Sequence, residues 1–225
     1  MFNLKFNLGN RKIEILIIVG AVILVAAVIG LAWLGLTSED RAMAKLAKDH
    51  PQGEKFLTQF REAKAKLKKD PKDFGAYFEI GQAKEEFKDY SGAAAAYGKS
   101  FELNPNSLVA LNNLGGVYVK MQEYQKAEAA YMESLDKFAG YTPTYYALVD
   151  LYQGYYTEKK SQIETIIQKG LKASPNDQNL LRLLAGYYVN AGEKDKAIET
   201  YTKILALKPD DTLIKNEIER LKAQK

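Results

Sequence analysis

The sequence contains no cysteine and only one histidine, which limits the chemistry open to it. Without cysteine there is no disulfide framework and no thiolate ligand for a metal ion. The one histidine, His50, stands just before Pro51, and a single imidazole without a cluster of further ligands makes a poor metal site. We therefore expect no metal and no cofactor.

The sequence also lacks the short motifs that mark many catalytic sites. It contains no G-x-S-x-G, H-E-x-x-H or G-x-G-x-x-G. The acidic pair Glu85-Glu86 falls at the end of an expected helix, where solvated carboxylates are commoner than an acid–base pair. We therefore expect no enzyme activity and no small-molecule substrate.

Strong charge is missing as well. Of the net charge of +4, residues 1–14 carry +2 and residues 37–70 carry +3, which leaves −1 for residues 71–225. Proteins that bind nucleic acids usually present a strongly basic face to the phosphates. The nearly neutral main part of the chain therefore predicts no nucleic-acid partner.

One long apolar run stands near the N-terminus, after a short basic tail at residues 1–14. Residues 15–36, ILIIVGAVILVAAVIGLAWLGL, carry no charge. A helix of this length spans about 33 Å, close to the ~30 Å hydrocarbon core of a bilayer. A surface helix of a globular protein would show a polar stripe, which this run lacks. The run predicts a single transmembrane helix.

A cleaved signal peptide is the alternative interpretation of this run. Its apolar core would be about 7–15 residues long, with a small-x-small cleavage site close behind. Here the first such tripeptide, residues 42–44, follows three charged residues at 39–41, which favours a retained anchor. Arg11 and Lys12 precede the run, and Lys and Arg prefer the cytoplasmic side. We expect a cytoplasmic N-terminus and a main domain outside the cytoplasm.

Beyond residue 70 the sequence repeats itself. Pro71 and Pro105 are 34 residues apart, Pro175 follows 70 residues later, and Pro209 follows after a further 34. Each of these prolines follows an apolar-periodic run, where it would end a helix. The same step of 34 joins Gly81 with Gly115, Ala93 with Ala127, and Tyr97 with Tyr131. Paired helices with this period predict an α-solenoid.

At these positions the chain resembles the tetratricopeptide repeat (TPR) family. The family pattern runs from a large residue through Leu-Gly, Tyr, Ala, an aromatic residue and a small residue to Pro. The first copy has Tyr77, Ile80, Gly81, Ala93, Tyr97, Ser100 and Pro105; the second has Leu111, Leu114, Gly115, Tyr118, Ala127, Tyr131 and Ser134; the fourth has Leu181, Leu184, Ala185, Tyr188, Ala197, Tyr201 and Pro209. The third copy is degenerate, and its turn around residues 154–160 carries the two extra residues.

The resemblance implies an all-α fold: a TPR solenoid of about four helix-turn-helix repeats plus capping helices, behind the single transmembrane helix. The expected segments are a helical linker and N-terminal capping half-repeat at 37–70, repeats at about 74–107, 108–141, 142–177 and 178–211 within 71–211, and a C-terminal capping helix at 212–225. The last segment is expected to be a cap because Ile214, Ile218 and Leu221 share one helical face.

The pair Gly115-Gly116 invites a comparison with phosphate-binding loops. Such a loop needs a preceding strand and a following lysine, and neither is present. Packed helices approach to ~8–10 Å, depending on the side chains between them. Gly115 and Ala127 are small enough for such an approach, and Tyr131 would fill the space beside it. We predict a packing seam here.

In TPR arrays, the first helices of the repeats line a concave groove that often holds a peptide or a partner helix. The corresponding positions, which we expect to bind a partner, are Phe78, Gln82, Asn112, Asn113, Tyr146, Asp150, Arg182 and Asn190. Amides there would bond an extended backbone, while Phe78 and Tyr146 would hold apolar anchors. A solvated inner face without a ligand is the alternative.

The resemblance implies a protein-interaction scaffold. The architecture is similar to that of bacterial inner-membrane TPR proteins, which implies a bacterial inner or plasma membrane. The expected partners are the membrane, through residues 15–36, and other proteins or peptides. The expected role is that of an adaptor or chaperone in the assembly of membrane complexes or in protein export. A fixed structural subunit of a membrane complex, with no groove ligand, is the alternative.

Overall fold

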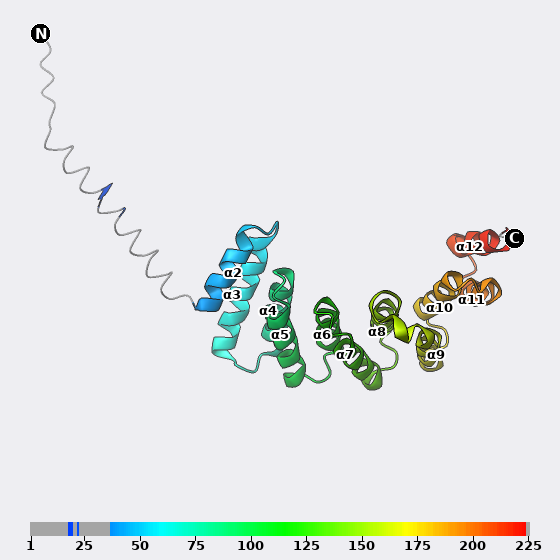
Figure 1. Cartoon of the computed structure of the whole chain (residues 1–225), viewed down its shortest axis with the longest axis horizontal. Helices are drawn as coiled ribbons and strands as arrows, with labels where there is room; N and C mark the ends of the chain where they lie inside the picture. Colours follow the sequence, from blue (N-terminus) through cyan, green and yellow to red (C-terminus); the bar gives the residue numbers. More distant parts are fainter. Residues whose placement is uncertain (1–17, 20–21, 23–36, 224–225) are drawn as a thin grey trace, which may run out of the picture. The chain divides into compact units, whose positions relative to one another are not determined.

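A computed structural model describes residues 18–19, 22 and 37–223, and the regular elements within them are all helical (Figure 1). The expected membrane segment, residues 15–36, lies outside the described residues except for Ile18, Val19 and Val22. In the part of the chain that the structure describes, no helix combines the length and the apolar character needed to cross a bilayer.

The chain divides into two compact units, Met1–Leu57 and Thr58–Lys225. The described part of the smaller unit contains α2 (Ser38–Lys48) and the start of α3 (Gly53–Lys69). Thr37 begins α2 with a capping box. Its hydroxyl accepts the N–H of Asp40, and the Asp40 carboxylate accepts the N–H of Thr37 at 2.9 Å. These two bonds satisfy donors that a helix start otherwise leaves unpaired.

The larger unit contains the rest of α3, four antiparallel helix pairs and a final helix (Figure 1). The pairs are α4 (Phe74–Glu86) with α5 (Tyr90–Leu103), α6 (Leu108–Lys120) with α7 (Tyr124–Lys137), α8 (Thr142–Asp150) with α9 (Ile163–Ala173), and α10 (Gln178–Asn190) with α11 (Lys194–Leu207); α12 (Thr212–Ala223) follows. Each pair packs on the next along the chain. The predicted all-α solenoid is confirmed.

Side-chain caps fix where several of these helices begin. Asp73, Asp89, Ser107 and Asp177 each accept a backbone N–H from the first turn of the helix that follows. Such a cap typically stabilises a helix by about 1 kcal/mol. The final helix α12 buries Ile214, Ile218 and Leu221, the face that their spacing predicts.

Glycine and tyrosine meet at the seam inside the first two pairs. A Cβ atom at Gly115 would lie 2.5 Å from Cε1 of Tyr131, and one at Gly81 would lie 2.6 Å from Cδ1 of Tyr97. Ala127 beside this contact is fully buried. No larger residue fits without moving a tyrosine ring, so the predicted packing seam at Gly115 is confirmed.

The third pair crosses from its first helix to its second in an irregular way. In the other pairs three residues make this crossing, at 87–89, 121–123 and 191–193. The middle residue of each is left-handed: Lys88 and Gln122 at φ 61°, and Gly192 at φ 75°. In the third pair α8 runs on as a π-helix, Leu151–Tyr155, and then as a 3₁₀-helix, Thr157–Gln162. The extra residues of the degenerate repeat lie in this crossing.

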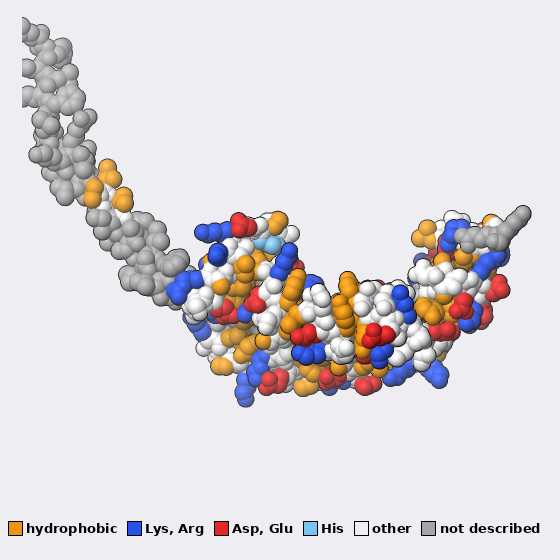
Figure 2. Space-filling view, in the orientation of Figure 1, with side chains coloured by type: hydrophobic (Ala, Val, Ile, Leu, Met, Phe, Trp, Pro, Cys, Tyr) orange, Lys and Arg blue, Asp and Glu red, His pale blue; other side chains and the backbone are white. Residues whose placement is uncertain are grey.

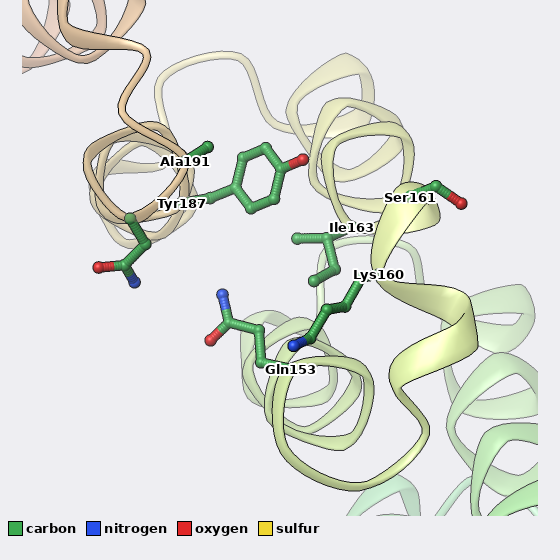
Figure 3. A pocket seen from close by; sticks show the side chains of 7 residues that line it. Gln153, Lys160, Ser161, Ile163, Tyr187 and Ala191 are labelled. Carbon is green, nitrogen blue, oxygen red and sulfur yellow. The ribbon is translucent and has the colours of Figure 1, made fainter.

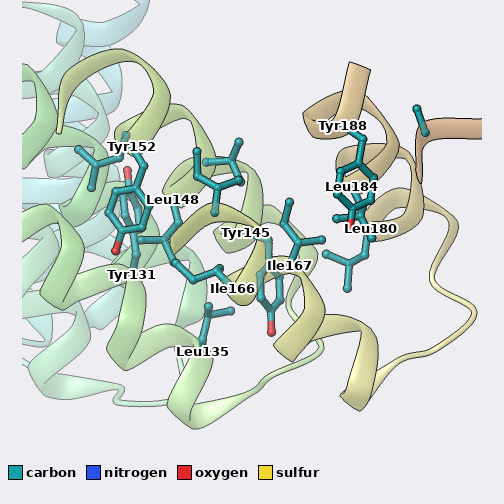
Figure 4. Close-up of a cluster of buried hydrophobic side chains, with 14 of the residues drawn as sticks. Tyr131, Leu135, Tyr145, Leu148, Tyr152, Ile166, Ile167, Leu180, Leu184 and Tyr188 are labelled. Carbon is teal, nitrogen blue, oxygen red and sulfur yellow. The ribbon is translucent and has the colours of Figure 1, made fainter. Parts of the chain in front are cut away.

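A cluster of buried side chains spans the second, third and fourth pairs (Figure 4). Tyr145 and Tyr152 from the third pair lie at its centre, together with Leu148 and Ile167. A Cβ atom at Gly170 would lie 2.7 Å from Cζ of Tyr145. The third pair therefore also has a glycine–tyrosine contact, but here the glycine is on the second helix, α9, and the tyrosine is on the first, α8. Tyr145 and Tyr152 are therefore core residues of the third pair.

Substitution of Gly115 tests this packing. We expect Gly115→Ala to lower the free energy of unfolding by about 1–2 kcal/mol, because overpacking against Tyr131 outweighs the better helix propensity of alanine. The matched control is Gly98→Ala in α5, where a Cβ atom would meet nothing within 4 Å. That change should be stabilising by up to about 1 kcal/mol. Urea unfolding followed by circular dichroism measures both, and equal effects would contradict the packing seam.

Candidate partner-binding groove

The first helices of successive pairs are tied directly to one another. Lys120 on α6 lies 2.9 Å from the Glu85 carboxylate on α4. The Thr144 hydroxyl on α8 donates to Oδ1 of Asn112 on α6 at 2.8 Å. The Tyr146 hydroxyl, also on α8, donates to the carbonyl of Asn179 on α10 at 3.0 Å. These contacts make α4, α6, α8 and α10 one continuous face.

A hollow of about 210 Å³ opens on this face between α8 and α10. Four of the residues expected to bind a partner meet there: Tyr146 and Asp150 from α8, and Arg182 and Asn190 from α10. The side chain of Tyr146 is 38 % exposed, so part of its ring can be reached from solvent. An aromatic ring, a carboxylate, a guanidinium and an amide therefore converge on one site.

Two other expected groove residues, both on α4, make internal contacts instead. The ring of Phe78 lies 5.4 Å from that of Tyr97 and packs on a small cluster with Ala93 and Val117. Gln82 accepts a hydrogen bond from the side-chain amide of Gln59 on α3 at 3.1 Å. Neither residue lines the hollow.

The two expected asparagines on α6 are also engaged within the protein. Asn112 accepts from Thr144, whose hydroxyl lies 3.0 Å from that of Ser134 in the core. Asn113 lies near the hydroxyl of Tyr97, which itself donates to the Glu85 carboxylate at 2.7 Å. Burial and the neighbouring Glu85 raise the pKa of Tyr97 well above its usual value, and Asn113 opposes that shift. Of the eight expected residues, the structure therefore brings four together and places four elsewhere.

The charged residues of the hollow differ in how firmly they are held. Arg182 bonds the buried carboxylate of Asp211 at 2.5 Å, and Asp211 also caps α12 through the N–H of Ile214. The Arg182 guanidinium and that N–H hold the pKa of Asp211 below its usual value. Asp150, by contrast, has no cation within ion-pair distance among the described residues. Arg182 is thus partly structural, whereas Asp150 is available to a ligand.

Sequence mapping missed Tyr187, which also lines the hollow. Its neighbour Tyr188 is buried, and its hydroxyl donates to Glu164 of the preceding repeat at 2.6 Å. Adjacent residues on a helix point about 100° apart, so one tyrosine of this pair turns outward when the other is buried. The Tyr187-Tyr188 doublet is therefore the signal in the sequence that points to Tyr187 as a groove residue.

Charges of both signs are mixed over the visible surface of the larger unit, without one continuous basic stripe (Figure 2). Among the described residues, no group of three or more acidic or histidine side chains is arranged to hold a metal ion. The groove itself offers aromatic, charged and amide side chains.

Family models identify the repeat unit. Residues 74–107, 108–136 and 180–215 match models described as tetratricopeptide repeat. Three of the four helix pairs of the larger unit therefore match the tetratricopeptide repeat, and the pairs pack as an α-solenoid. The third helix pair falls between the matched stretches, in agreement with its irregular crossing. TPR solenoids are protein-interaction scaffolds that bind other proteins or peptides.

Known proteins resemble the TPR solenoid over much of its length. "Tetratricopeptide repeat protein 37" of Xenopus laevis is 24% identical over 80% of this chain, and "Superkiller complex protein 3" of Homo sapiens is 31% identical over 55%. The aligned parts make up 10% and 8% of those proteins. A solved TPR protein from Parabacteroides merdae has a TM-score of 0.55 at 15% identity, covering 82% of this chain and 73% of its own. That likeness shows the fold alone.

The inter-repeat bond of Tyr188 gives a testable pH dependence. Burial and the Glu164 carboxylate raise the pKa of Tyr188 to about 12. Because an unfolded tyrosine ionises near pH ~10, its contribution to stability is complete below that pH and is lost as the pH rises from about 10 to 12. We expect Tyr188→Phe to flatten that alkaline loss and to cost about 1 kcal/mol at neutral pH. Urea unfolding at several pH values measures this.

The matched control is Tyr155→Phe. This side chain is 57 % exposed and its hydroxyl makes no hydrogen bond among the described residues. The control should change neither the neutral stability nor the alkaline loss. An alkaline loss that is the same in Tyr188→Phe and in the wild type would contradict the role given to the Tyr188–Glu164 bond.

Proposed function

We propose that this chain is a membrane-anchored scaffold that holds a peptide segment of a partner protein in the groove between α8 and α10. The observation that carries the proposal is the hollow of about 210 Å³ where Tyr146, Asp150, Arg182 and Asn190 converge. Exposed tyrosine is common at the centre of protein interfaces, because it buries a large area at a small cost in side-chain entropy.

The shape and lining of the hollow suit an extended peptide. Asn190 on α10 and Gln153 in the third crossing both line it, and their side-chain amides can donate to and accept from a peptide backbone. Tyr146 can pack on a side chain of the ligand, while Asp150 offers an unpaired carboxylate. The site thus combines backbone recognition with contacts that select side chains.

The anchor is the second part of the proposal. Residues 15–36 are uncharged and long enough to span a bilayer as a helix, and Arg11 and Lys12 precede them. This pattern supports a cytoplasmic N-terminus, with the TPR solenoid on the opposite side of a bacterial inner or plasma membrane. A groove held near the bilayer suits an adaptor or a chaperone in the assembly of membrane complexes or in protein export.

A fixed structural subunit is the second candidate function. It is favoured by the internal engagement of Phe78, Gln82, Asn112 and Asn113. Because these side chains already hold helices together, the inner face of the first two pairs offers a ligand little that is unpaired. In that case the outer faces and the anchor would make the contacts with the complex.

A double variant in the hollow separates these two functions. We expect Tyr146→Ala with Asn190→Ala to reduce the amount of partner crosslinked in native membranes at least about tenfold, since removal of an aromatic anchor commonly costs more than 1.4 kcal/mol of binding. Quantitative mass spectrometry of the crosslinked material measures this. Phe78 and Asn112 are left intact, because substitution there would disturb internal packing.

The control is Phe138→Ala with Asn176→Ala, an exposed aromatic residue and an exposed asparagine outside the hollow. The control should retain the partner at the wild-type level. If the hollow variant also retains a stoichiometric partner while its circular dichroism is unchanged, the groove is not the binding site and the structural subunit is the correct function.

The anchor has its own test. We expect the full chain to stay in the membrane pellet after carbonate extraction, and a chain lacking residues 1–36 to be released, because the apolar run is then missing. With the proposed orientation, protease added outside intact spheroplasts should digest the solenoid. Release of the full chain by carbonate would refute the anchor, and protection of the solenoid would refute the orientation.

A further inference from the structure

A second hollow, of about 370 Å³, adjoins the first where the third pair crosses from α8 to α9. Its lining residues are Gln153, Lys160, Ser161, Ile163, Tyr187, Asn190 and Ala191 (Figure 3). Gln153, Tyr187 and Asn190 line both hollows, so the two are parts of one continuous groove. A peptide that lies in the first hollow therefore reaches the second.

The floor of the second hollow is apolar and its rim is polar. Ile163, the first residue of α9, is only 1% exposed, and Tyr187 and Ala191 from α10 lie opposite it. Figure 3 shows the side chains of Ile163, Tyr187 and Lys160 directed into the same space from different elements. Because Ile163 is already almost fully buried, a branched or aromatic side chain of a ligand would gain mainly by covering Tyr187 and Ala191, at about 25 cal/mol per Å² of apolar area removed from water.

Two neighbouring lysines of the 3₁₀-helix differ in their partners. Lys159 lies 3.2 Å from the Glu128 carboxylate and over the ring of Tyr156. Lys160 lines the second hollow and has no acidic side chain within ion-pair distance among the described residues. An unpaired ammonium therefore stands at this end of the groove, while the unpaired carboxylate of Asp150 stands in the first hollow. This charge pattern favours a ligand that carries charges of opposite sign on the two sides of an apolar residue.

We propose that the second hollow is the specificity site for an extended peptide segment that carries an apolar residue followed by Asp or Glu. The apolar side chain lies on Ile163, Tyr187 and Ala191, and the acidic side chain pairs with Lys160. A basic residue on the other side of the apolar one pairs with Asp150. This inference rests on the proposed peptide-binding function and names the chemistry of its ligand.

The irregular crossing is what creates this site. The other pairs cross in three residues, which leaves no position equivalent to Lys160. Single π-helical turns and 3₁₀ segments within helices occur frequently at functional sites. Here the π-helix supplies Gln153 and the 3₁₀-helix supplies Lys160 and Ser161. The extra residues of the third repeat thus provide both the amide and the charge at the rim.

The test uses the full chain in nonionic detergent and short fluorescent peptides with a central leucine. In matched sets, the residue after leucine is Asp, Glu, Lys or Ala, and fluorescence anisotropy gives the affinity. We expect the wild type to bind the acidic set about fivefold more tightly than the lysine set, the effect of one exposed ion pair near 1 kcal/mol. Lys160→Glu should reverse this order, and Lys160→Met should abolish the preference.

The control is Lys172→Glu, an exposed lysine of α9 outside the hollow that gives the same change in net charge. It should keep the wild-type order. If the peptides bind but Lys160→Glu keeps the wild-type order, the acidic specificity is refuted and the peptide-binding groove stands. If no peptide of any set binds the wild type, both the specificity site and the proposed function are refuted.

Discussion

The architecture depends on one recurring contact, in which a tyrosine ring packs closely against a helix at a glycine, which has no side chain. Gly81 receives Tyr97 and Gly115 receives Tyr131, each at a distance that would not admit a Cβ atom. Because the ring and the bare backbone set the separation of the two helices, they also set the angle at which the next pair can pack. The direction of the first helices, and with it the position of the groove, follows from this contact.

A second kind of contact joins one pair to the next. Tyr152 donates to Glu128 at 2.5 Å, and Tyr188 donates to Glu164 at 2.6 Å, in both cases from the first helix of a pair to the second helix of the pair before. A charge-assisted bond of a partly buried tyrosine is stronger than a neutral one. It also fixes which face of the first helix turns inward, so that Tyr187, next to Tyr188, is directed to the groove.

The spacing of Gly, Tyr and Pro was enough to predict the helix pairs and the packing role of Gly115. These features depend on contacts between residues of the same repeat. The choice of partner by a polar groove residue is not local, since Asn112 pairs with a threonine 32 positions away. Repeat position alone therefore placed Asn112 in the groove without showing that its carbonyl is already occupied. Lys160 has no equivalent position in a regular repeat. The family pattern therefore could not predict it as a groove residue.

The third helix pair is the one that departs from the regular repeat, and its irregular crossing forms the second hollow. In a regular pair, a tight crossing with one left-handed residue brings the second helix back at once, which leaves the inner face closely packed. In the third pair, the π- and 3₁₀-helical crossing places α9 further along the chain. It leaves space above Ile163 that no side chain of the described residues fills. Regular pairs on either side hold the walls of that space in place. A local loss of repeat regularity therefore produces a preformed hollow on a rigid support, which lowers the entropy cost of binding a peptide there.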